Sequence, residues 1–254
     1  YTLTASNESA TVTASVRALV FPNPPEEIWP ALQSAPSEAV DVFPLGSEWS
    51  YFHPQDGVDP VENDPDFYTT WMKATGYDGP GFKQSGQAIL GYGTINRGGL
   101  STNIGRPASG VRYTAYFKRE FTVTQGVDLG LEMLSDDAAI VYIDGTEVVR
   151  TSNFSTPDAF HGLASRTGDE SNTYLYGMGA MGSGTHTIAV SVHNANVTSS
   201  DIGFDLRLFS VARPNEFVNW TTDSGLANRP ASEQAMDADP DEDGHPNLLE
   251  YALG

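Results

Sequence analysis

Cysteine is absent from this chain of 254 residues, and lysine and arginine are scarce. Without cysteine the chain has no disulfide, no thiolate nucleophile and no Cys-ligated zinc. The 13 Lys and Arg stand against 33 Asp and Glu, which gives a formal net charge of −20 at pH 7. Nucleic acids and anionic lipid surfaces bind clustered cations, so we expect neither among the partners.

Long apolar runs are missing as well. No stretch approaches the roughly 20 apolar residues that cross a bilayer, so we expect no membrane insertion. The first residues already alternate as strands do, and we expect that a secretion signal was removed or lies farther upstream. An acidic chain without cysteine is compatible with a secreted or cell-surface protein that gains stability from metal ions.

Residues 1–20 alternate apolar and polar side chains on both sides of the turn SNES. This period of two predicts a β-hairpin, which resembles the last strands of an Ig-like unit. Two strands cannot bury a core alone, so the hairpin either ends a preceding unit or pairs with another domain. Residues 21–42 are rich in proline and are predicted to form a stiff linker.

Residues 43–213 are predicted to form one antiparallel β-sandwich. The strand candidates are short and are separated by Gly, Pro, Asn and Asp. No stretch repeats apolar residues at the helical period, and many short strands with turns between them favour a sandwich. The candidates are 113–124, 129–134, 140–143, 186–193 and 202–211. Residues 214–254 are more polar, and we predict an irregular, partly helical extension there.

The segment DPDEDGHPNLLE, residues 239–250, has the spacing of an EF-hand-type calcium loop. Alternate residues of a tight turn point their oxygens inward, a central glycine permits the sharp bend, and the last glutamate can give two oxygens. The predicted ligands are Asp239, Asp241, Asp243, His245 (through its carbonyl), Asn247 and Glu250. The alternative is an acidic tail without metal. We expect Ca²⁺ in a structural role.

A second acidic pair, Asp136 and Asp137, stands in LSDDAAIVYIDG, residues 134–145. Both aspartates lie at the start of a predicted strand that ends in Asp144-Gly145 and continues into a second strand. Two neighbouring carboxylates could hold a metal ion or a ligand. Alternatively, both cap a loop and accept hydrogen bonds from backbone N–H groups.

The same stretch resembles the Asp-Asp segment of PA14 domains and galactose-binding-like jelly rolls. In some PA14 lectins such a pair holds a calcium ion that coordinates sugar hydroxyls, so the resemblance implies calcium at Asp136 and Asp137. Further motifs recur in the order of a jelly-roll module found in large secreted proteins of Verrucomicrobia and Planctomycetes: PLGSEWSYF (44–52), TTW (69–71), ILGYGT (89–94), YFKREFTV (116–123) and HNANVTSSDIGFDLRL (193–208). The tail resembles the dockerin-like or thrombospondin type 3-like connector of such proteins.

These resemblances imply an all-β fold: an antiparallel jelly-roll β-sandwich at 43–213, preceded by the hairpin and followed by a calcium-loop connector at 214–254. Polar residues in the predicted loops 95–112 and 193–201 are candidates for sugar contacts, because amides and guanidinium groups suit hydroxyls. The candidates are Asn96, Arg97, Asn103, Arg106, His193, Asn194 and Asn196. Trp49 and Trp71 are expected in the core instead.

No sequence pattern predicts catalysis. GMGAMG, residues 177–182, satisfies G-x-G-x-x-G, but a strand follows where a dinucleotide site needs a helix, so we expect a turn. GxSxG and HExxH motifs are absent. We therefore expect a non-catalytic, calcium-stabilised module of a larger secreted protein that binds a polysaccharide or surface glycan. The alternative is a structural module that spaces neighbouring domains or self-associates through strand pairing of the hairpin.

Overall fold

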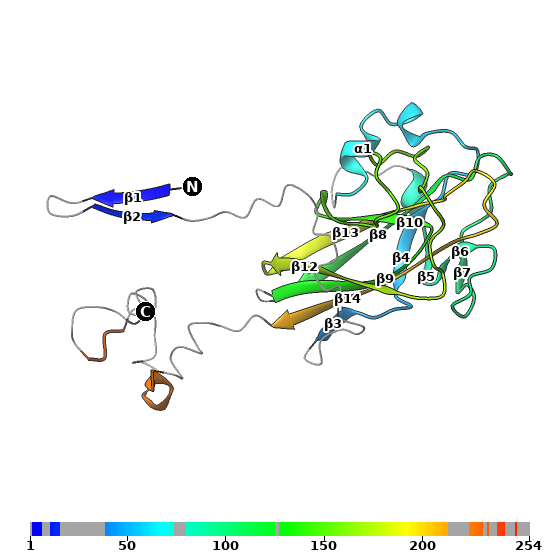
Figure 1. Ribbon diagram of the computed structural model, residues 1–254. Helices are drawn as coiled ribbons and strands as arrows, with labels where there is room; N and C mark the ends of the chain where they lie inside the picture. The colour runs from blue at the N-terminus through cyan, green and yellow to red at the C-terminus, as the bar shows by residue number, and fades with distance from the viewer. Residues whose placement is uncertain are drawn as a thin grey trace. The chain divides into compact units, whose positions relative to one another are not determined.

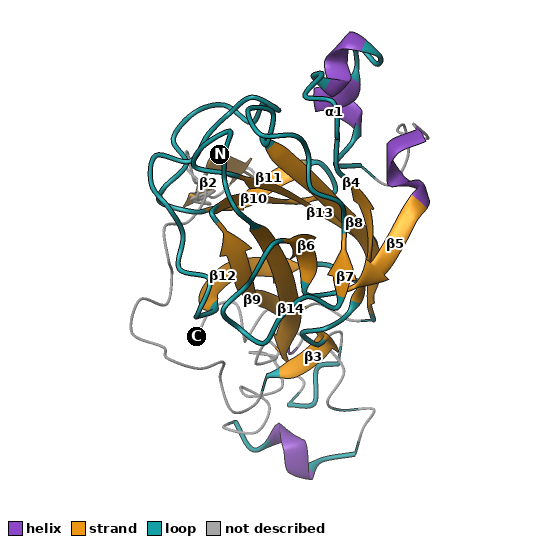
Figure 2. Cartoon of the chain, turned by 90° about the vertical axis from the view of Figure 1, so that its right-hand side faces the viewer, coloured by secondary structure: helices purple, strands orange, loops and turns teal. Residues whose placement is uncertain are grey.

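In the computed structural model the described residues are 2–6, 11–15, 39–73, 80–124, 127–212, 224–230, 233, 238–241 and 247. Strands dominate this part of the chain, so the fold class is all-β as predicted (Figure 2). The chain divides into two compact units, residues 1–211 and 212–254. Within the described ranges no helix has the length and apolar character of a membrane span.

One sheet has six strands in the order β11-β10-β13-β8-β4-β5, and all its neighbours pair antiparallel (Figure 1). Asp144 and Gly145 form the tight turn from β10 to β11, with φ angles of 50° and 84°. Positive φ at both central residues is what a two-residue hairpin turn requires. The strands are β4 (Glu48–Phe52), β5 (Gln84–Gln87), β8 (Thr114–Val123), β10 (Ala138–Ile143), β11 (Thr146–Arg150) and β13 (Gly184–His193).

The other sheet has the order β12-β9-β14-β6-β7, and β3 also pairs with β14. β6 and β7 are parallel, whereas β12 with β9, β14 with β6 and β14 with β3 pair antiparallel. The strands are β3 (Val40–Phe43), β6 (Leu90–Tyr92), β7 (Thr102–Asn103), β9 (Val127–Asp136), β12 (Tyr174–Met181) and β14 (Ile202–Ala212). β3 thus begins inside the range predicted as linker. The predicted turn at GMGAMG was wrong: most of these residues belong to β12, where the register shifts between Gly177 and Gly179.

The two sheets pack face to face on a shared apolar core. Phe117 of β8 stacks on Phe204 of β14 with ring centroids 4.4 Å apart, and Trp49 of β4 meets Phe204 edge-on at 5.0 Å. All three side chains are buried, and each such burial contributes about 1.5–3 kcal/mol. The five strands predicted from the sequence are present as β8, β9, β10, β13 and β14. Side-chain patterns can predict strands because alternate residues of a strand share one face.

The outer face of the β11-to-β5 sheet is covered as well. It packs against helix α1 (Phe67–Thr70) and the segment after β11, and the short 3₁₀ turns η1 (Pro60–Glu62) and η2 (Pro80–Lys83) flank α1 in the chain. Phe67 and Trp71 join Tyr116 and Tyr142 in this second apolar cluster. Every residue of β10 is therefore buried, which explains why its sequence AAIVYI does not alternate. Trp49 and Trp71 are core residues, as predicted.

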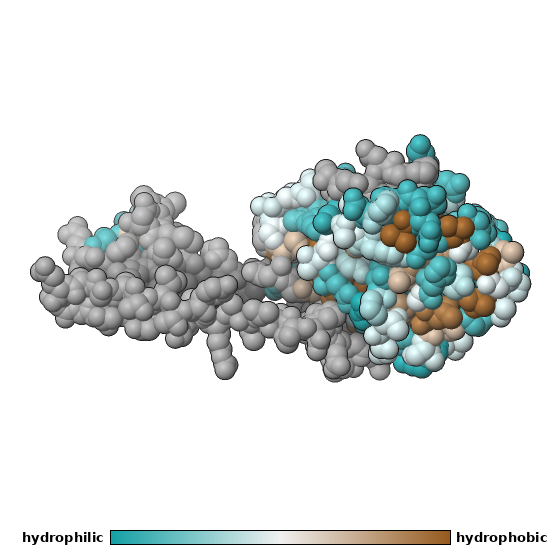
Figure 3. Space-filling view, turned by 90° about the horizontal axis from the view of Figure 1, so that it is seen from above, coloured by the Kyte–Doolittle hydropathy of each residue, from teal (hydrophilic) through white to brown (hydrophobic). Residues whose placement is uncertain are grey.

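Three connections cross between the sheets at one end of the sandwich. β9 passes to β10 through Asp137 alone, β11 to β12 through residues 151–173, and β13 to β14 through residues 194–201. These ends lie together because Ala138 pairs with His193 and the N–H of Thr151 donates to the carbonyl of Ala139. Residues 93–101 reach the same end, since β6 pairs with the start of β14. Seen from above, the sandwich mixes hydrophilic surface with smaller hydrophobic patches (Figure 3).

The remaining described elements belong to neither sheet of the sandwich. β1 (Thr2–Ser6) and β2 (Thr11–Ser15) form the antiparallel hairpin that their alternation predicts. In the second unit, η3 (Leu226–Asn228) is a single 3₁₀ turn.

Candidate cation site and adjoining pocket

Three acidic side chains, from the end of β9 and from two connections, meet at this end of the sandwich. They are Asp136, Glu170 and Asp201, and each offers a carboxylate oxygen within 4.8 Å of the other two. Three carboxylates in one place repel one another unless a cation or protons intervene. We call these residues the acid cluster.

The fold positions each member of the acid cluster. Asp136 is the last residue of β9, and Asp201 directly precedes β14. The turn that carries Asp201 packs closely on Gly93, where an added Cβ would lie only 2.5 Å from the carbonyl oxygen of Ser200. Glu170 comes from the segment between β11 and β12, and Asn96 holds its carboxylate through both its backbone N–H and its side-chain amide.

Asp136 is the buried member, with 6% of its surface exposed. Its Oδ2 has no hydrogen-bond partner in the described part of the chain. Burial, the charge of Asp137 and the charges of Asp201 and Glu170 raise the pKa of Asp136 to about 8. Burial and the charge of Asp201 also raise the pKa of Glu170. An ionised carboxylate in this position is costly without a partner, and a bound cation would remove that cost.

Asp137 differs from Asp136 in that both of its carboxylate oxygens accept hydrogen bonds, although a cis peptide bond joins the two residues directly. Its Oδ1 accepts the backbone N–H of Gly168 at 2.9 Å, and its Oδ2 accepts that of Ala195 at 2.6 Å. The carboxylate of Asp137 therefore links the short connection between β9 and β10 to the two longer connections, residues 151–173 and 194–201. The structure thus separates the two predicted aspartates: Asp136 enters the acid cluster, and Asp137 caps loops.

Asn194 begins the connection from β13 to β14. Its side chain is fully buried, and its amide nitrogen donates to the hydroxyl of Tyr92 at 3.1 Å and to the carbonyl of Arg112 at 3.3 Å. Its Oδ1 has no hydrogen-bond partner among the described residues. The amide therefore links this connection to β6 and to the segment before β8.

His193 is fully buried in a polar network rather than presented to solvent. Ser191 Oγ and Asp158 Oδ1 both approach its Nε2, at 3.0 and 3.2 Å, and Thr114 Oγ1 lies 2.9 Å from its Nδ1. Ser191 and Asp158 approach the same ring nitrogen, and the hydroxyl of Thr114 donates to the carbonyl of Phe160 at 2.7 Å. The network joins β8 and β13 to the segment after β11.

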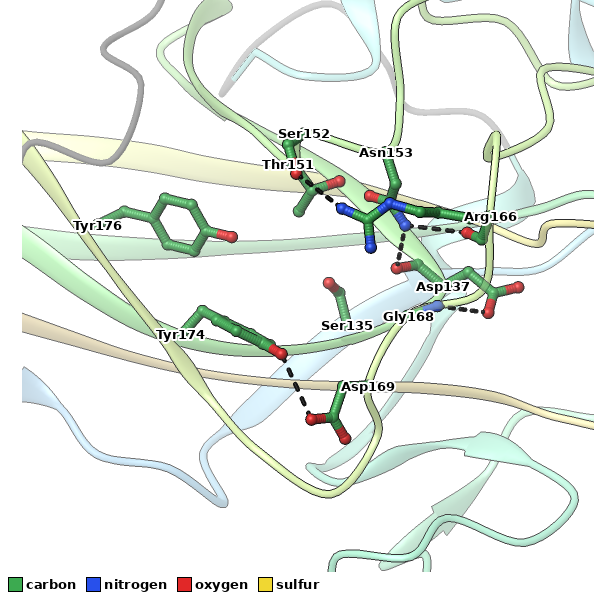
Figure 4. Close-up of a pocket in the computed structure, with 10 residues that line it drawn as sticks. All are labelled: Ser135, Asp137, Thr151, Ser152, Asn153, Arg166, Gly168, Asp169, Tyr174 and Tyr176. Carbon is green, nitrogen blue, oxygen red and sulfur yellow. Dashed lines mark hydrogen bonds between the residues drawn. The ribbon is translucent and has the colours of Figure 1, made fainter. Parts of the chain in front are cut away.

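A pocket of about 230 Å³ adjoins the acid cluster (Figure 4). Its wall is polar, with hydroxyl, amide, guanidinium and carboxylate groups beside two tyrosine rings. Figure 4 shows Arg166, Ser135 and Tyr176 around a common space, with Tyr174 and Asp169 along one side. The lining residues are Ser135, Asp137, Thr151, Ser152, Asn153, Arg166, Gly168, Asp169, Tyr174 and Tyr176.

The segment of residues 166–170 contributes to both the pocket and the acid cluster. Arg166 and Asp169 line the pocket, whereas Glu170 belongs to the cluster. The backbone of Gly168 lies so close to β9 and β10 that a Cβ there would come within 2.5 Å of the Asp137 carbonyl oxygen. Only glycine fits this contact. The backbone of the segment therefore packs directly against the backbone of Ser135 and Asp137.

The other predicted ligand residues are dispersed over the loops. Arg97 and Arg106 are exposed, and Arg106 lies over the ring of Tyr92 at 5.9 Å. Asn103 and Asn196 are exposed, and their side-chain oxygens accept hydrogen bonds within their own turns. Of the predicted sugar-contacting residues, Asn96 is the one that bonds directly to the acid cluster.

The predicted C-terminal calcium loop is described only in part. Asp243, His245 and Glu250 lie outside the described residues. Asn247 is buried; its amide nitrogen donates to the carbonyl of Glu233 at 2.7 Å, and its backbone N–H to that of Ala238 at 2.8 Å. Asp239 is half-buried and Asp241 exposed. Calcium at this loop stays a prediction.

Comparison with known proteins gives no family. No family model matches the chain, and no curated protein matches it. Among solved structures, a β-glucuronidase of an uncultured Clostridium sp. is 12% identical with a TM-score of 0.42, over 71% of this chain and 30% of that chain. Ruminococcus gnavus β-glucuronidase in complex with D-glucuronic acid is 9% identical with a TM-score of 0.42, over 70% and 30%. The alignments span less than a third of those chains, and no activity follows from them.

Sequence reasoning missed Glu170, Asp201 and the pocket residues Arg166, Asp169 and Tyr174. They lie in connections or at a strand start, where no periodic pattern marks them. One signal was available: residues 151–173 form a long segment without secondary structure inside a sandwich, and such loops commonly serve binding or catalysis.

Proposed function

We propose that this chain is a non-catalytic, calcium-dependent glycan-binding module of a larger extracellular protein. The observation that carries the proposal is the acid cluster, in which the buried carboxylate of Asp136 meets Glu170 and Asp201 and keeps one oxygen without a partner. Such an arrangement suits a cation that replaces the missing hydrogen bonds and offsets the repulsion.

Calcium is the cation that this donor set favours. It takes six to eight hard oxygens in flexible geometry, and carboxylates with amide oxygens supply them. Asp136, Glu170 and Asp201 would hold the ion, while Asp137 keeps the connections in place. When bound, the ion would supply positive charge and open coordination positions for hydroxyl oxygens.

The glycan part of the proposal rests on what surrounds the acid cluster. A pocket lined by hydroxyl, amide and guanidinium groups adjoins it, and two tyrosines stand in the same wall. Sugars present many hydroxyls together with an apolar C–H face, which such a wall complements. The jelly-roll strand arrangement, secretion and the C-terminal calcium connector belong to the same proposal and follow from the sequence resemblance.

A glycan array probed with the full chain tests this function. We expect binding to a defined group of glycans in calcium and loss of that binding in EGTA. The variant Asp136→Asn with Glu170→Gln should lose it in both conditions, whereas Glu120→Gln, which changes an exposed acid of β8, should bind as the original chain does. An array with no glycan bound in calcium, together with concentration-dependent oligomers, would instead favour a structural module.

A further inference from the structure

We propose that the pocket beside the acid cluster is a subsite for one uncharged sugar residue of the glycan. This inference rests on the proposed glycan-binding function and gives it a place and a chemical class. At about 230 Å³ the pocket falls below the roughly 300 Å³ at which whole-ligand pockets begin, so it suits one unit of a longer chain.

Arg166 supplies the hydrogen-bond donors of this subsite. Its Nη2 donates to Ser152 Oγ at 3.2 Å, which fixes the guanidinium above the pocket (Figure 4). In the described part of the chain no carboxylate forms an ion pair with Arg166, unlike Arg150, which is held by Glu147. A guanidinium carries five N–H donors, and most of those of Arg166 are available to the oxygens of a ligand.

Asp169 supplies the matching acceptor on the other side. Its Oδ1 accepts the backbone N–H of Ser171 at 2.9 Å and its Oδ2 the amide of Asn172 at 2.7 Å, so the carboxylate is held in place. These hydrogen bonds, that of Asn172 first, lower the pKa of Asp169, and the group is ionised at neutral pH. A fixed carboxylate with remaining lone pairs accepts hydrogen bonds from sugar hydroxyls. Neighbouring hydroxyls of one sugar ring can thus bond to Asp169 and Arg166 together.

Tyr174 and Tyr176 supply the apolar part of the wall. They alternate along β12 and so point to the same face of the sheet. Tyr176 is buried, while Tyr174 keeps 40% of its surface exposed and is one of the few large exposed hydrophobic residues described. An aromatic ring with this exposure can receive the C–H face of a sugar ring.

The charges of the pocket favour an uncharged ligand over an acidic one. Arg166 is the one cation in the lining, against the two acidic residues Asp137 and Asp169. A uronic acid or sulfated sugar would bring a further negative charge to these acids. Its repulsion would offset the gain from Arg166.

The subsite and the acid cluster are coupled through the segment of residues 166–170. A calcium ion on Glu170 would stabilise the segment that presents Arg166 and Asp169. Sugar affinity should therefore rise with calcium even though this subsite does not require the sugar to touch the ion.

The test is a calorimetric titration of the full chain in calcium with methyl galactoside, methyl glucoside and methyl mannoside, and with galacturonate and glucuronate. We expect a neutral glycoside to bind more tightly than the uronate of the same configuration. Arg166→Gln and Tyr174→Ala should each weaken binding about tenfold or more, which is the size of one charge-assisted hydrogen bond or one ring contact. Lys83→Gln, which changes an exposed cation outside the pocket, is the matched control and should bind within about twofold of the original chain.

The outcomes separate the subsite from the function as a whole. The calcium-induced rise in melting temperature should be the same in Arg166→Gln and in the original chain, since Arg166 does not belong to the acid cluster. Unchanged sugar affinity in both pocket variants, with calcium-dependent glycan binding intact, would overturn the subsite alone. Tighter binding of a uronate than of its neutral counterpart would overturn the charge argument. Absence of any glycan binding on the array would overturn the function and the subsite together.

Discussion

Asp136 and Asp137 are neighbours in the chain, yet two backbone N–H groups bind the carboxylate of Asp137, while Oδ2 of Asp136 has no hydrogen-bond partner in the described residues. One carboxylate thus stabilises the connections at the end of the sandwich, and the other faces two further acids. The difference gives the two residues separate, measurable roles.

Substitution of each aspartate by asparagine should separate these roles. Asp137→Asn keeps the size of the side chain but replaces one acceptor oxygen by a donor that faces a backbone N–H. It should lower the free energy of unfolding by about 1–3 kcal/mol with or without calcium. Asp136→Asn replaces a buried carboxyl group whose ionised form is costly by a neutral amide of the same size, so in EGTA it should leave stability unchanged or higher, and it should abolish the gain from calcium. Urea unfolding of both variants in calcium and in EGTA measures this; equal behaviour of the two variants would contradict it.

Gly168→Ala should destabilise both the acid cluster and the pocket. A Cβ at this position would lie 2.5 Å from the carbonyl oxygen of Asp137 and 3.0 Å from that of Ser135, and the backbone at the junction of β9 and β10 cannot easily yield. We expect a loss of about 1–3 kcal/mol in the free energy of unfolding and weaker calcium binding. Gly182→Ala is the control, because a Cβ there meets no atom within 4 Å. Equal stability of the two alanine variants would show that the 166–170 segment is not held as described.

His53 makes stability depend on pH. Burial lowers the pKa of His53 from 6.5 to about 4. Between these values the unfolded chain binds a proton that the folded chain does not, so this residue's contribution is complete above pH 6.5 and is lost as pH falls toward 4. The loss amounts to about 3 kcal/mol. Urea unfolding in EGTA across this range should show a steeper fall for the original chain than for His53→Gln. Asp136 contributes a pH dependence of the opposite sign, because its pKa is raised. Both proteins contain Asp136, so its contribution cancels when the two stability curves are subtracted. Parallel curves would contradict the assignment.

The predicted C-terminal loop should contribute calcium stabilisation of its own. Calcium that binds only the folded state adds about 2.7 kcal/mol at a hundredfold excess over its dissociation constant. Asp241→Asn with Asp243→Asn should reduce the calcium-induced rise in melting temperature without changing glycan binding. Calorimetry of this double variant beside Glu120→Gln checks the effect; an identical calcium response in both would mean that the tail holds no ion.

Local patterns predicted most of the sandwich but little of the site. Alternation and turn residues predicted β13 and β14 and the turn at Asp144-Gly145, because strands and tight turns depend on near neighbours in sequence. The sequence also singled out Asp136 and Asp137. Which of the two is satisfied depends on Gly168 and Ala195, which are distant in sequence, so no local pattern could decide it.

The predicted sugar-contacting residues illustrate the same limit. His193 and Asn194 lie at the end of a strand, where a jelly roll commonly gathers ligand loops, and they were predicted to contact a sugar. In the structure both side chains are buried: Phe154 of the segment after β11 packs on His193 with ring centroids 4.1 Å apart, and Asn194 donates to Tyr92 and Arg112. Sequence patterns do not show which face a long irregular segment will cover, because that depends on packing with α1 and β10.

The most direct test of the account is a calorimetric calcium titration of the full chain beside Asp136→Asn with Glu170→Gln. The acid cluster predicts that the double variant binds one calcium ion fewer than the original chain and stays folded in EGTA. The same number of ions bound with the same affinity in both proteins would contradict a calcium site at Asp136, Glu170 and Asp201.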